Sequence, residues 1–155
     1  MSNNKIEIID FSAELKDPIQ TLNYEWLEKY FKVEEGDVVA LSNPQEQIID
    51  KGGFVFYAKL NDEIVGTASL LKKSESVFEI GKMAVTEKAQ GHRIGTILLE
   101  HCLNIAKQKQ IKTLILYSNT QLESAIHLYR KYGFYEIELE QGLYERANIK
   151  MEKHL

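Results

Sequence analysis

The sequence predicts a mixed α/β fold in which one sheet is flanked by helices. Three observations lead to this prediction. A strand-like run and two helical segments come first, strand-like runs joined by a tight turn follow, and helices alternate with strands in the last third. Hairpins followed by β-α-β crossovers form a mixed sheet. A chain of 155 residues has the size of one ordinary domain, so we expect a single domain over residues 1–155.

The first segments predict a strand and a helix. Residues 5–11 alternate with an apolar bias, which indicates the first strand. Residues 18–31 predict a helix that begins with a proline in its first turn, where the missing N–H costs nothing. We expect Trp26 in the core, because it repeats at helical spacing with Leu22 and Tyr30.

A second, shorter helix and three strands are expected in the middle of the chain. Asn43 and Pro44 fit an N-cap and a first-turn proline, and predict a helix through Lys51 that Gly52-Gly53 ends. Asn61-Asp62 is expected to form a tight hairpin turn between two strands. The three strands are predicted at residues 54–60, 63–71 and 74–85.

Helices and strands alternate in the last third. The predicted helices cover residues 94–109 and 122–132, each with apolar residues on one face. Gly133 suits the C′ position of the second helix, which requires αL geometry. Further strands are predicted at residues 112–117, 134–139 and 144–151. The expected order is therefore β-α-α-β-β-β-α-β-α-β-β.

Charge and composition exclude several classes of protein. The net charge is −4 and the basic residues are spread out, which argues against nucleic acid as a partner, since phosphate-backbone binding needs a concentrated basic surface. Cys102 is the single cysteine and the four histidines are scattered, so we expect neither a disulfide nor a metal site. Without an apolar run of roughly 20 residues or a secretory signal, we expect a cytoplasmic protein and no membrane partner.

A glycine-containing loop, Gln90-Gly91-His92-Arg93-Ile94-Gly95-Thr96, links the strand that ends at Val85 to an amphipathic helix. Backbone N–H groups at such a helix N-terminus, together with the helix dipole, bind phosphate without requiring particular side chains. Taken alone, the loop fits equally well a plain strand-to-helix turn whose glycines serve packing.

A second motif follows about thirty residues later: Ala125-Ile126-His127-Leu128-Tyr129-Arg130-Lys131-Tyr132-Gly133-Phe134. The two motifs, in this order and at this spacing, resemble the acyl-CoA-binding core of the GNAT superfamily of N-acetyltransferases. The resemblance extends over almost the whole chain, and its specific part runs from Phe78 to Phe134. It implies a mixed, mostly antiparallel sheet of six to seven strands flanked by helices, and acetyl-CoA as cosubstrate without a metal.

The loop departs from the GNAT signature at one position. Gln90 and Gly95 match the first and last signature positions, but Arg93 replaces the middle glycine. Arginine can hold a right-handed helical conformation without strain and can offer a bidentate phosphate contact. A position that needs positive φ would instead favour glycine. The residues that the resemblance places at the cofactor are Met83, Ala84, Val85, Gln90, Gly91, His92, Arg93, Ile94, Gly95, Thr96 and Asn119.

Two side chains are candidates for the chemistry of acyl transfer. The resemblance implies that Tyr129 protonates the departing thiolate as general acid, which suits a phenol that is protonated at neutral pH. Glu79 is the candidate general base, and alternation along its strand predicts that it shares a face with Gly81, Met83 and Val85. A glutamate that orients substrate or pairs with a cation explains Glu79 as well.

Main-chain N–H groups and one amide complete the expected site. In the GNAT family, N–H groups near the end of this strand, here Met83 to Val85, stabilise the developing oxyanion. Asn119 can contact the pantetheine arm or serve only as a loop or cap residue.

The acceptor pocket of this fold is expected at Tyr24-Glu25-Trp26, Phe31 to Asp37 and Gly142 to Arg146. The leading hypothesis is an N-acetyltransferase that acts on a small-molecule or peptide amine by direct attack in a ternary complex. The alternative is a non-catalytic acyl-CoA-binding sensor or interaction module. A homodimer is compatible with both.

Overall fold

Seven strands form one mixed sheet in the computed structural model, which describes residues 5–140 and 146–155. The spatial order is β1-β2-β3-β4-β5-β7-β6. β4 and β5 pair in parallel, and the other neighbours pair antiparallel, which confirms the predicted sheet. The strands are β1 (Ile6–Asp10), β2 (Phe54–Leu60), β3 (Glu63–Lys72), β4 (Val77–Val85), β5 (Thr113–Ser118), β6 (Tyr135–Ile137) and β7 (Ile149–His154).

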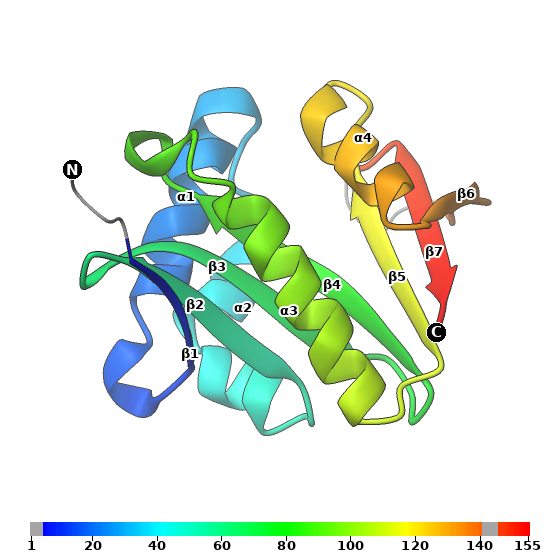
Figure 1. Ribbon diagram of the computed structural model, residues 1–155, viewed down its shortest axis with the longest axis horizontal. Helices are drawn as coiled ribbons and strands as arrows, with labels where there is room; N and C mark the ends of the chain where they lie inside the picture. Colours follow the sequence, from blue (N-terminus) through cyan, green and yellow to red (C-terminus); the bar gives the residue numbers. More distant parts are fainter. Residues whose placement is uncertain (1–4, 141–145) are drawn as a thin grey trace.

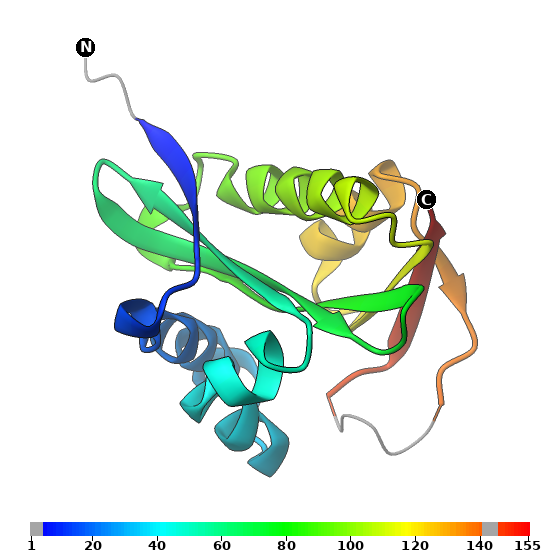
Figure 2. The same cartoon turned by 90° about the horizontal axis from the view of Figure 1, so that it is seen from below.

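Helices cover both faces of this sheet (Figure 1). α1 (Pro18–Tyr30) and α2 (Glu35–Ser42) lie on one face, while α3 (Ile94–Gln108) and α4 (Glu123–Lys131) lie on the other, as the side view in Figure 2 shows. The connections contain short turns, η1 (Ala13–Leu15), a π turn η2 (Gln45–Ile49) and η3 (Glu87–Ala89). None of the described helices has the length and apolar composition needed to cross a membrane.

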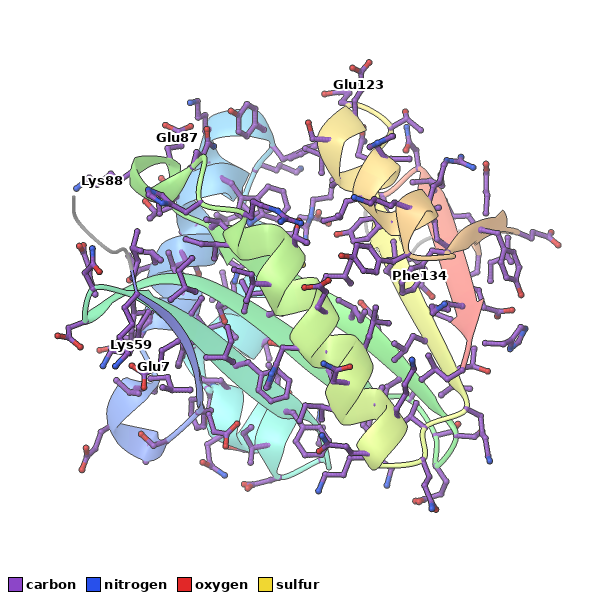
Figure 3. The ribbon with its side chains drawn as sticks, in the orientation of Figure 1. Glu7, Lys59, Glu87, Lys88, Glu123 and Phe134 are labelled. Carbon is purple, nitrogen blue, oxygen red and sulfur yellow. The ribbon has the colours of Figure 1, made fainter. Side chains whose placement is uncertain are left out.

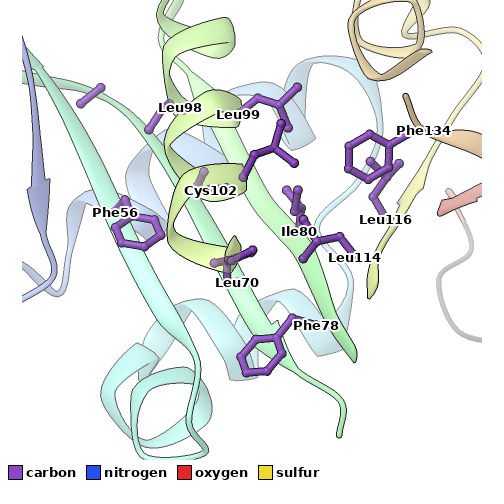
Figure 4. Close-up of a cluster of buried hydrophobic side chains, with 14 of the residues drawn as sticks. Phe56, Leu70, Phe78, Ile80, Leu98, Leu99, Cys102, Leu114, Leu116 and Phe134 are labelled. Carbon is purple, nitrogen blue, oxygen red and sulfur yellow. The ribbon is translucent and has the colours of Figure 1, made fainter. Parts of the chain in front are cut away.

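The main core lies between α3 and the sheet (Figure 4). Leu98, Leu99 and Cys102 of α3 are fully buried and meet apolar side chains of β2, β3, β4 and β5. Burial of each such leucine contributes about 1.5–3 kcal/mol to folding. The Cys102 thiol is free, and burial raises its pKa to about 12.

Two predicted turns have the expected backbone. Asn61 and Asp62 have φ of 51° and 71°, the paired positive values of a type I′ hairpin between β2 and β3. Gly133 has φ of 92° and ends α4 in a Schellman motif, because the Phe134 N–H donates to the Tyr129 carbonyl and the Gly133 N–H to the Arg130 carbonyl. This motif fixes where α4 stops and therefore where Tyr129 lies.

The second helix differs from the prediction. The helix expected at residues 44–51 is a π turn, and α2 instead occupies Glu35–Ser42. A capping box starts α2, in which Glu34 and Asp37 exchange side-chain to backbone hydrogen bonds. Glutamate is an unusual N-cap, and the helix has no clear apolar stripe, so periodicity could not find it. The last strand also starts later than predicted, at Ile149; residues 144 and 145 lie outside the described part.

A bulge in β4 overturns the predicted alternation. Lys82 has φ of 50°, and the pairing of β3 with β4 shifts by one residue there. Glu79 and Gly81 therefore face α1, whereas Met83 and Val85 pack with the core under α3. The prediction that these four residues share one face is wrong, because an extra residue reverses the alternation beyond it.

Candidate active site

A cavity of about 960 Å³ opens where β4 and β5 separate. Their parallel pairing ends at Glu79 and Ile115, and beyond this point the two strands diverge, as Figure 1 shows. Residues from both layers of helices line the cavity, so it reaches through the sheet. We call its two parts the loop side, lined by residues 83–96 with α4, and the aromatic side, lined by α1, Asp37, Lys82 and Arg146.

The loop side contains the predicted phosphate-binding turn. Gly91 has φ of 89°, and Arg93, which immediately precedes α3, has φ of 59° and ψ of 28°. The expectation that arginine keeps a right-handed conformation here is therefore wrong. An αL conformation costs a non-glycine residue roughly 1–2 kcal/mol, which is a physical reason for glycine at this position of the signature.

Open space surrounds both glycines of this turn. A Cβ atom added at Gly91 would meet nothing within 4 Å, and at Gly95 it would make only an ordinary contact of 3.9 Å to the Met83 Cε. Packing inside the protein therefore does not require glycine at position 95, although glycine inside a helix costs about 1 kcal/mol. The plain packing explanation of these glycines loses its support, and the free surface suits the close approach of a ligand.

The cavity brings together nearly all the predicted site residues. His92 is the exception, since it does not line the cavity. The predicted residues that do line it are Glu79, Met83, Ala84, Val85, Gln90, Gly91, Arg93, Ile94, Gly95, Thr96, Asn119 and Tyr129.

Tyr129 lies on α4 against the core, with its ring edge-on to Phe134 at 6.0 Å between ring centroids. Burial, with a smaller contribution from the nearby Cys102, raises the pKa of Tyr129 to about 12. Tyr129 lines the cavity, and no hydrogen bond joins its hydroxyl to another described residue. The side chain is thus a protonated donor available to a molecule in the cavity.

Glu79 lies deep in the sheet, with 3% of its surface exposed. Its carboxylate forms an ion pair with the Lys73 ammonium at 3.1 Å and also faces the cavity. Both predicted explanations, a base or a paired carboxylate, are compatible with this position.

Asn119 is engaged inside the protein at both ends of its amide. The Nδ2 group donates to the Arg146 carbonyl at 2.7 Å, and Oδ1 accepts from the Gln121 N–H at 2.8 Å. These bonds support the loop and cap role more than a pantetheine contact.

The aromatic side corrects the prediction for Trp26. Its ring is half-buried and lines the cavity, while the adjacent Leu27 takes the core position. The Arg146 guanidinium lies 5.9 Å from the Trp26 ring centroid, and Phe31 meets that ring edge-on. Tyr30 is exposed and carries the Lys29 ammonium over its ring. The protein's own cations therefore already occupy cation–π positions on these rings.

A buried charge network supports this side, and sequence reasoning missed it. Arg146 donates to both oxygens of Asp37 at 2.8 Å and to Glu34 at 2.7 Å. The Lys82 ammonium lies 3.5 Å from Asp37, and both side chains are nearly inaccessible. Burial raises the pKa of Asp37, but hydrogen bonds from Arg146 and the Glu34 N–H outweigh it, and the net pKa is lowered. Burial lowers the pKa of Lys82.

Little in the sequence could have revealed this network, because Asp37, Lys82 and Arg146 are separated by dozens of residues. Of the three segments predicted for the acceptor pocket, Trp26, Phe31, Asp37 and Arg146 do line the cavity. Residues 142–145 lie outside the described part. Within residues 5–140 and 146–155, no three His, Cys, Asp or Glu side chains form a group that could hold a metal ion.

Comparisons with known proteins agree with this architecture. The model of the Acetyltransferase (GNAT) family matches residues 19–134. A GNAT-family acetyltransferase from Staphylococcus aureus superposes with a TM-score of 0.86 at 23% identity, covering 97% of this chain and 99% of that one. The PaiA N-acetyltransferase of Thermoplasma acidophilum, solved in complex with coenzyme A, gives a TM-score of 0.74 at 21% identity, with 97% and 99% covered. A search of curated proteins found no match.

Proposed function

Since this chain belongs to the GNAT family of acetyltransferases, we propose that it is an N-acetyltransferase that joins acetyl-CoA and an amine in one cavity. The observation that carries this proposal is the opening between β4 and β5, where the phosphate-type turn, the end of β4 and Tyr129 line one space. The two sides of the cavity then take different substrates, with the donor on the loop side and the acceptor on the aromatic side.

The residues of the loop side fit the pyrophosphate of CoA. Gly91 and Gly95 leave the main chain accessible, and the first N–H groups of α3 have no partner within the helix. These groups and the positive end of the helix dipole favour an anion. Arg93, held at the helix start, adds a cation beside them. Main-chain N–H groups of residues 83–85, at the end of β4, would stabilise charge on the acetyl oxygen.

Tyr129 would act on the leaving sulfur mainly as a hydrogen-bond donor. A thiol in water has a pKa of about 8.5, so complete transfer of a proton to its thiolate from a phenol with a pKa of about 12 is unfavourable, although burial in the cavity raises the pKa of the thiol in the same direction. A hydrogen bond to developing thiolate charge carries no such penalty, and charge-assisted hydrogen bonds are the strong ones. Such a hydrogen bond would assist the departure of the thiolate beside the general-acid role that the resemblance implies for Tyr129.

Glu79 would accept the proton that the amine loses, directly or through a water. Its position on β4, three residues before the bulge, places it between the aromatic side and the end of the strand. The Lys73 ammonium pairs with the same carboxylate. Glu79 can therefore act as the base only if the amine substrate takes the place of Lys73 at one of its oxygens.

The aromatic side would receive the acceptor. Its charges are paired with one another, and the faces of Trp26 and Tyr30 already have cationic neighbours. What remains for recognition is apolar ring surface beside Phe31, which favours an amine with an apolar body over a compact polycation. The single cysteine is consistent with a reducing cytoplasm.

Titration calorimetry with acetyl-CoA, with adenosine as the control, tests the donor. We expect binding to acetyl-CoA but not to adenosine, and release of free thiol when a suitable amine is added. Tyr129→Phe should lower kcat about tenfold to a hundredfold while leaving acetyl-CoA affinity nearly unchanged. Binding without thiol release from any amine of a broad panel would indicate the sensor instead. Absence of acetyl-CoA binding would overturn the proposal.

A further inference from the structure

The second half of β4 pairs on one side only, among the strands of residues 5–140 and 146–155. Its pairing with β5 ends at Glu79, so within this described part the segment that leads to the loop pairs with β3 alone. The same segment contains the bulge at Lys82, which interrupts the pairing with β3 as well. A strand in this situation needs support from outside the sheet to keep a defined position.

Helix α1 supplies this support at the bulge. Asn23 is 1% exposed, and its Nδ2 group donates to the Lys82 carbonyl at 3.1 Å and to the Ile19 carbonyl at 2.9 Å. Its Oδ1 accepts from the Trp26 indole N–H at 3.3 Å. One buried amide thus connects the bulge to a ring on the wall of the aromatic side.

Two residues further along α1, Glu25 holds the turn that follows β4. One carboxylate oxygen accepts from the Thr86 hydroxyl at 2.8 Å, and the other accepts from the Glu87 N–H at 2.9 Å. Glu87 pairs back with Lys29 of the same helix, and Figure 3 shows Glu87 beside the C-terminal part of α1. Thr86 has no capping bond of its own to η3, so Glu25 caps this turn from a distant element.

The negative charge of Glu25 distinguishes two ways in which this residue could affect donor binding, by positioning the turn or by electrostatic attraction. The turn η3 ends at Ala89 and leads directly into Gln90 and Gly91, where a phosphate would bind. A carboxylate near an anion site opposes anion binding by Coulomb's law. Any benefit of Glu25 to donor binding must therefore come from the geometry it imposes.

We propose that Glu25 is a positioning residue for the donor site, which fixes the turn before the phosphate-binding loop and ties it to the acceptor wall through α1. This inference rests on the proposed function. Trp26 and Tyr30 line the acceptor side from the same helix, so a displacement of α1 would change both halves of the cavity together.

Three variants and one control test the role of Glu25. Glu25→Ala removes both acceptors, Glu25→Gln retains one, and Thr86→Val removes one donor with little change of shape. Glu28→Ala is the matched control, because it removes the same charge from an exposed position of the same helix. We expect acetyl-CoA affinity to fall about tenfold for Glu25→Ala and about threefold for the other two. Glu28→Ala should bind acetyl-CoA equally or slightly more tightly.

Amide hydrogen exchange of the free protein gives a readout that does not depend on the donor. Exchange at residues 87–91 should become faster in Glu25→Ala and stay unchanged in Glu28→Ala. If the wild type fails to bind acetyl-CoA, the proposed function fails, and faster exchange still supports the positioning of this turn. Unchanged exchange, or equal affinity of wild type and Glu25→Ala, would overturn the inference.

Discussion

The loop side of the cavity is lined largely by one continuous stretch of main chain, whereas the aromatic side is lined by side chains from four separate places. Residues 83–96 supply N–H groups, two open glycines and a helix N-terminus. The aromatic side depends on α1, Asp37, Lys82 and Arg146, which only the folded structure brings together. Main-chain groups suit the binding of a chemical group that is the same in every donor, such as a pyrophosphate. Side chains can be substituted in evolution to suit different acceptors.

The unfavourable contributions to folding free energy also differ between the two sides. On the loop side the cost is local, since Arg93 adopts an αL conformation. On the aromatic side the cost is the desolvation of four charged groups, which their mutual hydrogen bonds offset. Substitutions on the first side should therefore have small, local effects, whereas removal of the carboxylate that the charges of the second side share should have a large effect.

The largest expected effect is that of Asp37→Ala on stability. The change leaves Arg146 and Lys82 nearly buried without their shared carboxylate, and breaking a buried ion pair in this way costs about 3–5 kcal/mol of unfolding free energy. Urea denaturation of both proteins measures the difference. Glu28→Ala, an exposed change, should stay within about 0.5 kcal/mol. A loss below about 1 kcal/mol for Asp37→Ala would mean that water already solvates the network.

Glu79→Gln should act on the rate. If the carboxylate accepts the proton of the amine, its loss lowers kcat about a hundredfold or more, with little change in the KM for acetyl-CoA. Steady-state kinetics with a productive amine provide the measurement. Lys73→Met removes the ammonium that pairs with this carboxylate and should not lower kcat. If the Glu79→Gln enzyme keeps its rate, Glu79 only orients the substrate, and a water molecule acts as the base.

Arg93→Gly and Arg93→Ala form a pair that separates strain from binding on the loop side. Both remove the guanidinium, so both should weaken acetyl-CoA binding by a similar factor. Only glycine relieves the αL conformation, and the glycine variant should be more stable than the alanine variant by about 1 kcal/mol. Thermal unfolding and calorimetry give the two quantities. Equal stabilities would show that the turn relaxes when the arginine is removed.

Lys82→Met should have the smallest effect at neutral pH, within about 1 kcal/mol, because Asp37 keeps both hydrogen bonds from Arg146. Burial lowers the pKa of Lys82 below its ordinary 10.5, although Asp37 opposes this. Between the folded pKa and 10.5 the unfolded chain binds more protons, so wild-type stability should rise with pH in that window. Denaturation curves recorded up to pH 10.5 should lack this rise in Lys82→Met. A parallel pH dependence in both proteins would contradict the assignment.

The fold and the loop side could be predicted because their signals are local. Three short segments predict their own backbone conformation from a few neighbouring residues: the Asn61-Asp62 turn, Gly133 after α4 and the glycine loop before α3. The sequence could not place Trp26, whose helical spacing fits the core and the cavity wall equally well. The bulge at Lys82 did leave a trace that the prediction missed, since the apolar positions change from Phe78 and Ile80 to Met83 and Val85 where the pairing slips by one residue.

The sequence by itself therefore determined the order of the strands, the helices other than α2, the phosphate-type turn and the position of Tyr129 at the end of α4. Tertiary structure decided the αL conformation of Arg93, the face of each β4 side chain and the network of Asp37, Lys82 and Arg146. The reason is physical. Periodicity and turn propensity act over a few residues, whereas the divergence of β4 from β5 and the burial of charges depend on contacts between segments far apart in the chain.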